Sequence, residues 1–303
     1  MRIGIVSQRV ANPATTLDDL VEEARTAEAQ GFAFLSLPNI FGHDAIGALS
    51  VVGRETQRIE LATGVVPSPP RHPVAMAQQA LTAQAACRGR FVLGIGLSHK
   101  IVIENLLGLS YAHPAKQMRE YLEVLMPLVQ GKPAKFEGEL YRVQASLQVA
   151  GGTPVPVVVA ALGPKLLEIA GRLADGTATW MTGTKTLASH TVPVIRAAAK
   201  AAGRPEPRVI AALPIAIASD PAKAREAASK SFAIYGTLPS YRAMLDREGA
   251  AQPGDVALVG DEQVLRTSLR RLADAGVTHF AASLFPAEEG AIGRTLEFLR
   301  AEL

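Results

Sequence analysis

Residues that suit ligand binding follow several apolar segments of the chain, at the point where each segment ends. The clearest case is Leu162-Gly163-Pro164-Lys165, which joins an apolar run to a segment with helical periodicity. A helix that begins there would offer free backbone N–H groups and a positive dipole end to a phosphate, and Gly163 would permit close approach. Thr182 and Thr184 follow the next apolar run and could donate hydroxyl hydrogen bonds to the same anion. Gly-Pro also simply turns a chain into a helix, so this motif alone leaves both interpretations open.

A second group of residues contains histidines. Ser98 and His99 follow Gly94-Ile95-Gly96, where glycine would let the backbone approach a ligand and the two side chains would contact its rim. A histidine near a loop is also commonly a surface or capping residue. His43 precedes Asp44, whose carboxylate could orient an imidazole or cap the next helix. The segment at Gly94 is not a dinucleotide fingerprint, because His99 replaces the third glycine.

Metal and hydrolase chemistry find little support in the sequence. It contains neither His-Glu-x-x-His nor Gly-x-Ser-x-Gly, so we predict no metal site and no serine nucleophile. Cys87 is the only cysteine, which excludes an internal disulfide framework, and its helical setting favours a buried core position.

Composition restricts the class of protein and its partners. The chain has 303 residues, 48% of them hydrophobic and 19% charged, as in ordinary globular proteins. The 31 basic and 28 acidic residues are scattered, which argues against nucleic-acid binding. No apolar run reaches membrane-spanning length and no targeting leader is evident, so we expect a cytoplasmic protein without a membrane partner.

The elements that must position these residues alternate between strand and helix. Eight continuously apolar runs are each followed by a segment with helical periodicity, as expected for parallel strands covered on both faces. An eightfold count favours a closed barrel over an open doubly wound sheet. We therefore predict an α/β fold, a (β/α)8 TIM barrel in one domain over residues 1–303, with a longer insertion between strands 4 and 5. The predicted strands are Arg2–Ser7, Phe32–Leu37, Ile59–Val65, Phe91–Gly96, Val155–Ala160, Thr177–Met181, Val209–Ala218 and His279–Phe285.

Helix starts can be predicted from capping residues. Thr16 with Asp19 forms a capping-box pattern, Asp44 and His72 precede helical segments, and Asp220 stands before a proline. In TIM barrels the active site lies at the carboxyl ends of the strands, where the polar residues described above would meet.

Several motifs, taken in order, resemble the luciferase-like monooxygenase superfamily. They are Ala62-Thr63-Gly64-Val65-Val66-Pro67, Arg71-His72-Pro73, Gly89-Arg90-Phe91, Gly94-Ile95-Gly96, Ser98-His99, Arg119-Glu120-Tyr121-Leu122, Gly163-Pro164-Lys165 and Ala174-Asp175-Gly176. Within that superfamily the chain is most similar to actinobacterial oxidoreductases that use the deazaflavin coenzyme F420.

The resemblance implies a site and a reaction. A non-proline cis peptide at Gly64-Val65, with Pro67 beside it, would back the deazaflavin ring, and Ser98 and His99 would also contact the cofactor. The phosphate would bind at Leu162, Gly163 and Pro164 and at Thr182 and Gly183. Asn39, His43 and His99 are the candidate catalytic residues, and the proton donor stays open among them. The resemblance further implies hydride transfer to or from a small organic substrate within a homodimer.

Three other functions stay open at this point. The same fold could bind FMN and act with oxygen as a two-component monooxygenase. It could also bind a flavin without catalysis. A barrel lyase or aldolase is the fourth possibility, although the Schiff-base lysine expected on a strand is not evident.

Overall fold

The residues described in the computed structural model are 1–7, 9 and 12–303. Within them, neighbouring parallel strands pair in sequence from β1 to β12, and β12 returns to pair with β1. The predicted (β/α)8 TIM barrel is therefore confirmed. The barrel strands, in order of pairing, are β1 (Arg2–Val6), β2 (Phe34–Leu37), β3 (Glu60–Thr63), β5 (Phe91–Gly96), β8 (Val157–Val159), β9 (Gly176–Trp180), β10 (Arg208–Ile217) and β12 (His279–Leu284).

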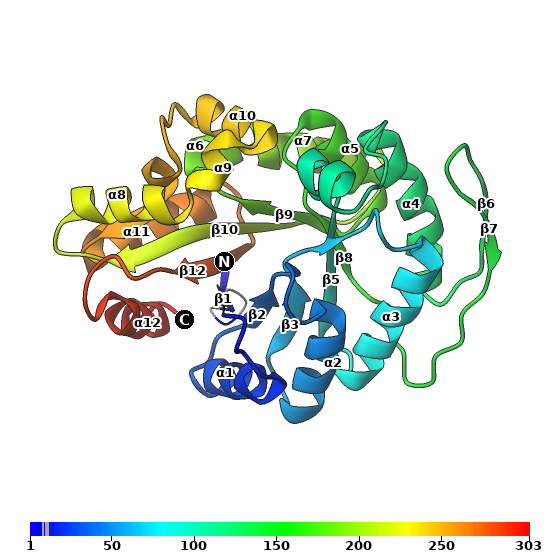
Figure 1. Ribbon diagram of the computed structural model, residues 1–303, viewed down its shortest axis with the longest axis horizontal. Helices are drawn as coiled ribbons and strands as arrows, with labels where there is room; N and C mark the ends of the chain where they lie inside the picture. Colours follow the sequence, from blue (N-terminus) through cyan, green and yellow to red (C-terminus); the bar gives the residue numbers. More distant parts are fainter. Residues whose placement is uncertain (8, 10–11) are drawn as a thin grey trace.

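Helices surround the strands, as Figure 1 shows. Thr16 and Asp19 make the predicted capping box, and His72, Asp44 and Asp220 each accept a hydrogen bond from the first turn of their helix. Such caps satisfy N–H groups that lack an intrahelical partner, which explains why these helices begin where they do. The main helices are α1 (Leu17–Ala29), α2 (Ala45–Glu55), α3 (Pro73–Ala86), α4 (Pro114–Val129), α5 (Pro164–Leu173), α7 (Val192–Ala201), α8 (Pro221–Ser231), α11 (Glu262–Asp274) and α12 (Ala291–Ala301).

The barrel interior is filled by side chains. Phe34, Val92 and Ile210 belong to an inner apolar cluster to which six of the strands contribute. A larger cluster lies between the strands and the helices and includes Cys87, which is fully buried as predicted. Because the interior is packed, ligands can bind only at the ends of the barrel or in its loops.

Two connections are much longer than the others. The predicted insertion after the fourth barrel strand is present, and it ends in an antiparallel hairpin held by the buried Glu120 carboxylate, which accepts the Leu140 N–H at 2.8 Å. The second long connection follows β10. The additional elements of these two connections are η2 (Ile101–Leu106), β6 (Ala134–Glu137) and β7 (Arg142–Ala145) in the first, and α9 (Ala233–Thr237), α10 (Pro239–Glu248), η4 (Pro253–Val256) and β11 (Leu258–Gly260) in the second.

Two predicted elements are divided in the structure. The strand predicted over Ile59–Val65 ends at Thr63, and pairing resumes in β4 (Val66–Pro67), which runs beside β5. The sequence pattern of Lys185–Ala202 also predicts one helix, and in the structure this region consists of α6 (Thr184–Thr186), the π-helical η3 (Leu187–Thr191) and α7. π-helical turns are often found at functional sites. His190 of η3 contacts the backbone that precedes α5, as described below.

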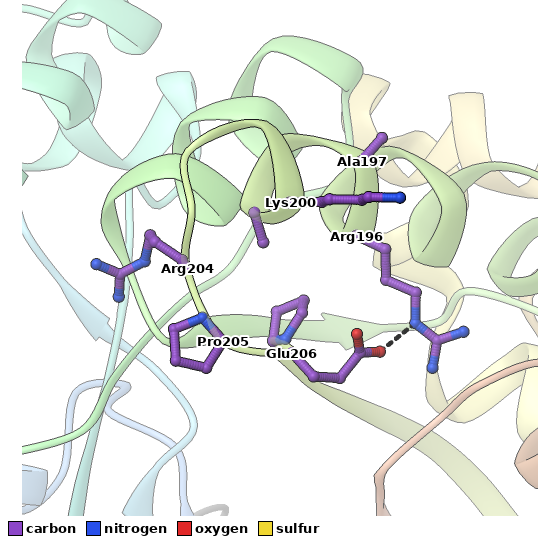
Figure 2. Close-up of a pocket in the computed structure, with 8 residues that line it drawn as sticks. Arg196, Ala197, Lys200, Arg204, Pro205 and Glu206 are labelled. Carbon is purple, nitrogen blue, oxygen red and sulfur yellow. Dashed lines mark hydrogen bonds and ion pairs between the residues drawn. The ribbon is translucent and has the colours of Figure 1, made fainter.

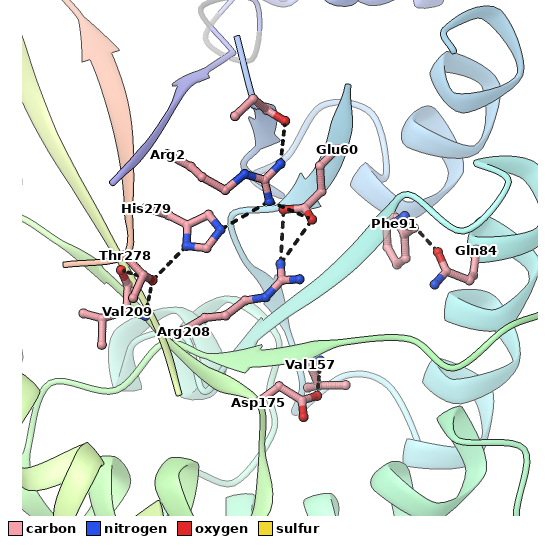
Figure 3. Close-up of polar contacts among 11 residues, drawn as sticks. Arg2, Glu60, Gln84, Phe91, Val157, Asp175, Arg208, Val209, Thr278 and His279 are labelled. Carbon is pink, nitrogen blue, oxygen red and sulfur yellow. Dashed lines mark hydrogen bonds and ion pairs between the residues drawn. The ribbon is translucent and has the colours of Figure 1, made fainter. Parts of the chain in front are cut away.

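Ion-paired side chains close the amino end of the barrel (Figure 3). Arg2, Glu60, Arg208 and His279 each stand at the first position of a barrel strand. Arg208 Nη1 lies 3.1 Å from Glu60 Oε1, and Arg2 Nη1 lies 3.4 Å from Glu60 Oε2. These charges are paired with one another, which leaves the carboxyl end of the barrel as the place where a site can form.

Candidate functional site

The exit of the third strand carries a cis peptide bond between Gly64 and Val65, as predicted. The Gly64 N–H donates to the Leu37 carbonyl at 2.9 Å, and Gly64 itself is exposed. Glycines allow this segment to lie close to β5: a Cβ added to Gly94 would collide with the Thr63 carbonyl, and one added to Gly96 would lie 3.0 Å from Val65 Cγ2. The result is a closely packed segment at the carboxyl end of the barrel in which Gly64 is exposed.

Ser98 and His99 follow β5 on the same rim. Ser98 has a positive φ of 59°, and its carbonyl accepts the Tyr111 hydroxyl at 3.2 Å. His99 is half-buried, and its ring centroid lies 5.6 Å from that of Tyr241. Burial lowers the pKa of His99 below its ordinary value, so the imidazole is neutral near pH 7.

The exit of β8 leads into α5 through Gly163, its N-cap residue. Gly163 offers no side-chain acceptor to the first turn of the helix, and a Cβ added there would meet nothing within 4 Å. The preceding Leu162 carbonyl lies 2.9 Å from Nε2 of the buried His190. The backbone here is therefore held in place while the helix N-terminus opens to free space, an arrangement that fits a phosphate.

The exit of β9 differs from the prediction in one respect. Thr182 is buried, and its hydroxyl donates to the Trp180 carbonyl at 3.3 Å. The carboxylate of Glu248, from the end of α10, accepts the N–H groups of Lys185 at 3.1 Å and Thr186 at 2.7 Å. A side chain of the protein itself thus fills the N-terminus of the helical segment that follows Gly183. The anion contact predicted at Thr182 and Gly183 stays a prediction.

The predicted residues after β2 engage neighbouring loops. The Asn39 side-chain oxygen accepts the Ala45 N–H at 3.0 Å, and exposed His43 places Nε2 2.9 Å from the Thr15 carbonyl. Asp44 caps α2 and forms an ion pair with Arg71. His43 and Asp44 therefore do not form a hydrogen-bonded pair with each other.

Contacts connect the strand exits around the rim. Gly96 at the end of β5 lies close to Ala160 at the exit of β8, because a Cβ added to Gly96 would lie 3.1 Å from Ala160 Cβ. His190 joins the exit of β8 to the helices after β9, and Glu248 joins those helices to α10. Tyr241 of α10 returns to His99. The structure thus brings the predicted cofactor residues to one end of the barrel, with Asn39 and His43 at the exit of β2.

Four residues of this rim were not predicted from the sequence. Trp180 is the last residue of a barrel strand, so its position at a strand end was a usable signal. Tyr241 and Glu248 lie in the long connection after β10, and His190 lies in the shorter one between β9 and β10. Spacing along the chain does not indicate which residues of such connections meet.

Two hollows lie away from this rim. One, of about 370 Å³, is bordered by Arg196, Lys200 and Arg204 near the end of α7, and Figure 2 shows Arg196 paired with Glu206 there. The other, of about 530 Å³, lies beside Leu81 and the segment 147–150. Neither hollow includes a predicted site residue.

The described residues contain neither a metal-binding cluster nor a membrane-spanning helix. No group of three or more His, Cys, Asp or Glu side chains in residues 1–7, 9 and 12–303 is arranged to hold a metal ion. In the same residues, no helix combines the length and apolar character needed to cross a membrane.

Known relatives cover different shares of the chain. A protein of Mycobacterium tuberculosis without a described function is 28% identical over 222 residues, which are 68% of this chain and 65% of that protein. This chain thus aligns with slightly less than two thirds of that relative. The 5,10-methylenetetrahydromethanopterin reductase of Methanolobus tindarius is 26% identical over 313 residues, covering 92% of this chain and 95% of the enzyme.

A solved structure and a family profile also match this chain. The F420-dependent tetrahydromethanopterin reductase of Methanopyrus kandleri superposes with a TM-score of 0.83 at 23% identity, over 100% of this chain and 98% of that one. At that identity the likeness shows the fold alone. The profile of the luciferase-like monooxygenases matches residues 1–279. With the barrel and the glycine-rich strand exits described above, this match shows that the chain belongs to the luciferase-like monooxygenase family.

Proposed function

We propose that this protein is a coenzyme F420-dependent oxidoreductase, which transfers a hydride between the deazaflavin and a small organic substrate. The observation that carries the proposal is the open N-terminus of α5 at Gly163, on the same rim as His99 and Gly64, in a chain of this family. The F420-dependent tetrahydromethanopterin reductase of Methanopyrus kandleri, which has the same fold, supports F420 as the cofactor.

The residues at the carboxyl end of the barrel fit such a cofactor. The N–H groups that begin α5 would hold its phosphate, with Leu162, Gly163 and Pro164 around it. Exposed Gly64 and half-buried Val65, followed by Pro67, would support the flat ring, and Ser98 and His99 would lie at its edge. When bound, the deazaflavin supplies a hydride donor or acceptor.

The chain's own side chains would orient the reactants through hydrogen bonds. His99 is neutral, so one ring nitrogen can donate a hydrogen bond while the other accepts one. His43 already contacts the Thr15 carbonyl through Nε2, which leaves Nδ1 as its atom for proton exchange. The Asn39 side-chain oxygen is engaged by the Ala45 N–H, and its amide nitrogen is the group that can orient a substrate oxygen.

Equilibrium titration with F420 and, separately, with FMN tests the proposal. We expect F420 to bind with micromolar or lower Kd and to be reduced or oxidised in the presence of a substrate. Gly163→Ala should weaken F420 binding by about tenfold, because a methyl group would fill the space beyond Gly163, while the fold is kept. Gly293→Ala, which also meets no atom within 4 Å but lies in α12, is the matched control.

Comparison of the two cofactors distinguishes the alternative functions. Tight FMN binding without F420 binding would replace the proposal by an oxygen-dependent monooxygenase. Binding of F420 without any redox turnover would favour a cofactor-binding protein. The homodimer implied by the sequence is part of the same proposal, and the molecular mass in solution tests it.

A further inference from the structure

Five rings form a continuous group at the carboxyl end of the barrel, here termed the mouth cluster: His99, Tyr241, Tyr235, Trp180 and Phe232. Their centroids are separated by 5.6 Å from His99 to Tyr241, 5.0 Å from Tyr241 to Tyr235, and 5.7 Å from Tyr235 to Trp180. Trp180 also lies 5.5 Å from Phe232. Three of these pairs meet edge to face, an arrangement favoured by aromatic rings. They are Trp180 with Phe232, Trp180 with Tyr235, and Tyr235 with Tyr241.

The mouth cluster crosses the rim rather than lying on one element. His99 follows β5, Trp180 ends β9, and the other three rings belong to the connection after β10. Helix α10 is held at both ends, through Tyr241 on His99 and through Glu248 on the helix after β9. It therefore links the residue that follows β5 to the helical segment after β9.

The rings of the cluster carry no charge of their own. Burial lowers the pKa of His99 below its ordinary value. Burial and neighbouring Tyr235 raise the pKa of Tyr241. Both groups are thus neutral near pH 7. An ionised substrate placed against these rings would lose its hydration without gaining a partner, which is strongly unfavourable.

The Tyr241 hydroxyl is available as a hydrogen-bond donor. Within the described part of the chain this hydroxyl makes no hydrogen bond, and the residue is half-buried. A phenol held by ring contacts on two sides is a fixed donor at the mouth of the barrel.

We propose that Tyr241 positions the substrate by donating a hydrogen bond to an uncharged carbonyl or hydroxyl oxygen, and that the mouth cluster selects small neutral alcohols and carbonyl compounds. This inference rests on the proposed function, because it concerns the substrate of the same site.

The fluorescence of Trp180 provides a direct test, since it is the only tryptophan and belongs to the cluster. Cyclohexanone and cyclohexanol are titrated into the protein, with cyclohexanecarboxylate as the charged probe and cyclohexene as the probe without oxygen. We expect saturable changes with the two neutral oxygen compounds and with cyclohexene, and none with the carboxylate.

Tyr241→Phe separates positioning from packing. We expect its Kd for cyclohexanone to rise by about fivefold to tenfold, as for loss of one hydrogen bond, while its Kd for cyclohexene is unchanged. Tyr141→Phe is the matched control, because it also removes a tyrosine hydroxyl but its ring packs on His72 and Tyr121 outside the cluster.

Several outcomes would overturn the inference. They are equal binding of the carboxylate, no response to either oxygen probe, or an unchanged cyclohexanone Kd in Tyr241→Phe. If Tyr241→Phe does not fold, the preference of the wild-type protein between neutral and charged probes still tests the inference. F420 titration is measured separately, so loss of the proposed cofactor is distinguishable from failure of the substrate assignment.

Discussion

At the scale of single residues, histidines at the two ends of the barrel differ in burial and in partners. Half-buried His99 lies at the carboxyl end, where burial lowers its pKa below the ordinary value. His279 lies at the amino end, and burial lowers its pKa to about 4 even though Glu60 acts in the opposite direction. Its Nδ1 is 2.8 Å from the Thr278 hydroxyl, and Nε2 is 3.5 Å from Arg2 Nη1. The first histidine faces the rim, and the second is part of the core.

His279 should make the free energy of unfolding depend on pH. The unfolded chain binds a proton near the ordinary pKa of 6.5, whereas the folded chain does so only near 4. Stability present above pH 6.5 is therefore lost as the pH falls to about 4, by roughly 2–4 kcal/mol at about 1.4 kcal/mol per pKa unit. Denaturant unfolding between these pH values measures the loss.

The matched variants isolate this histidine from the carboxylates. His279→Asn should reduce the pH dependence in that window, whereas His113→Asn, at an exposed position with φ 54°, should retain it. Identical pH profiles for His279→Asn and the wild type would contradict the prediction.

At the scale of elements, α10 shows how a long connection becomes part of a site. Its end carries Glu248, whose carboxylate caps the helical segment after β9, and its first turns carry Tyr241. A Cβ added to Gly183 would collide with that carboxylate, so glycine is required for the close approach. The helix is thus attached to the barrel at two exits.

Glu248→Gln should have two measurable effects. Loss of a charged cap should lower the stability of the cofactor-free protein by about 1 kcal/mol, seen as a lower Tm. Loss of a negative charge beside the predicted phosphate site should also lower the Kd for F420 by several fold. Asp246→Asn is the control, because it removes the same charge from α10 at a position 66% exposed and paired with Arg242. Equal effects of the two substitutions would show that the cap is unimportant.

At the scale of the whole molecule, closure of the barrel depends on its last strand. Residues 2–5 of β1 pair with β12 on one side, and β10 pairs with it on the other. Phe280, Ala282 and Leu284 of β12 belong to the main core. The family profile ends at residue 279, yet the strand that follows joins the first and seventh barrel strands.

Removal of residues 280–303 should therefore prevent folding. Two strand edges and the core beneath α12 would be exposed, so we expect loss of cooperative thermal unfolding and of the native circular dichroism spectrum. Removal of residues 302 and 303 alone should cost only about 1 kcal/mol, because it breaks a partly exposed ion pair between Arg266 and Glu302. A folded barrel without β12 would contradict this view of closure.

Much of the fold of this protein could be predicted from local sequence patterns. Apolar runs that alternate with helical segments, together with helix caps, predicted eight strand–helix units. Both signals are local, because a strand buried on both faces is apolar throughout and a helix needs hydrogen-bond acceptors for its first N–H groups. The Gly163-Pro164 helix start and the glycines at 94 and 96 were visible for the same reason. The family motifs added the cis bond between Gly64 and Val65, which spacing alone would not have indicated.

Only the tertiary structure decided which distant residues meet. Glu248 occupies N–H groups of Lys185 and Thr186, and Tyr241 lies on His99, across separations that no local pattern encodes. His43 and Asp44 are adjacent in sequence, yet they contact Thr15 and Arg71 rather than each other. The physical reason is that secondary structure depends on neighbours along the chain, whereas a site at the strand ends depends on how long connections fold back over the barrel.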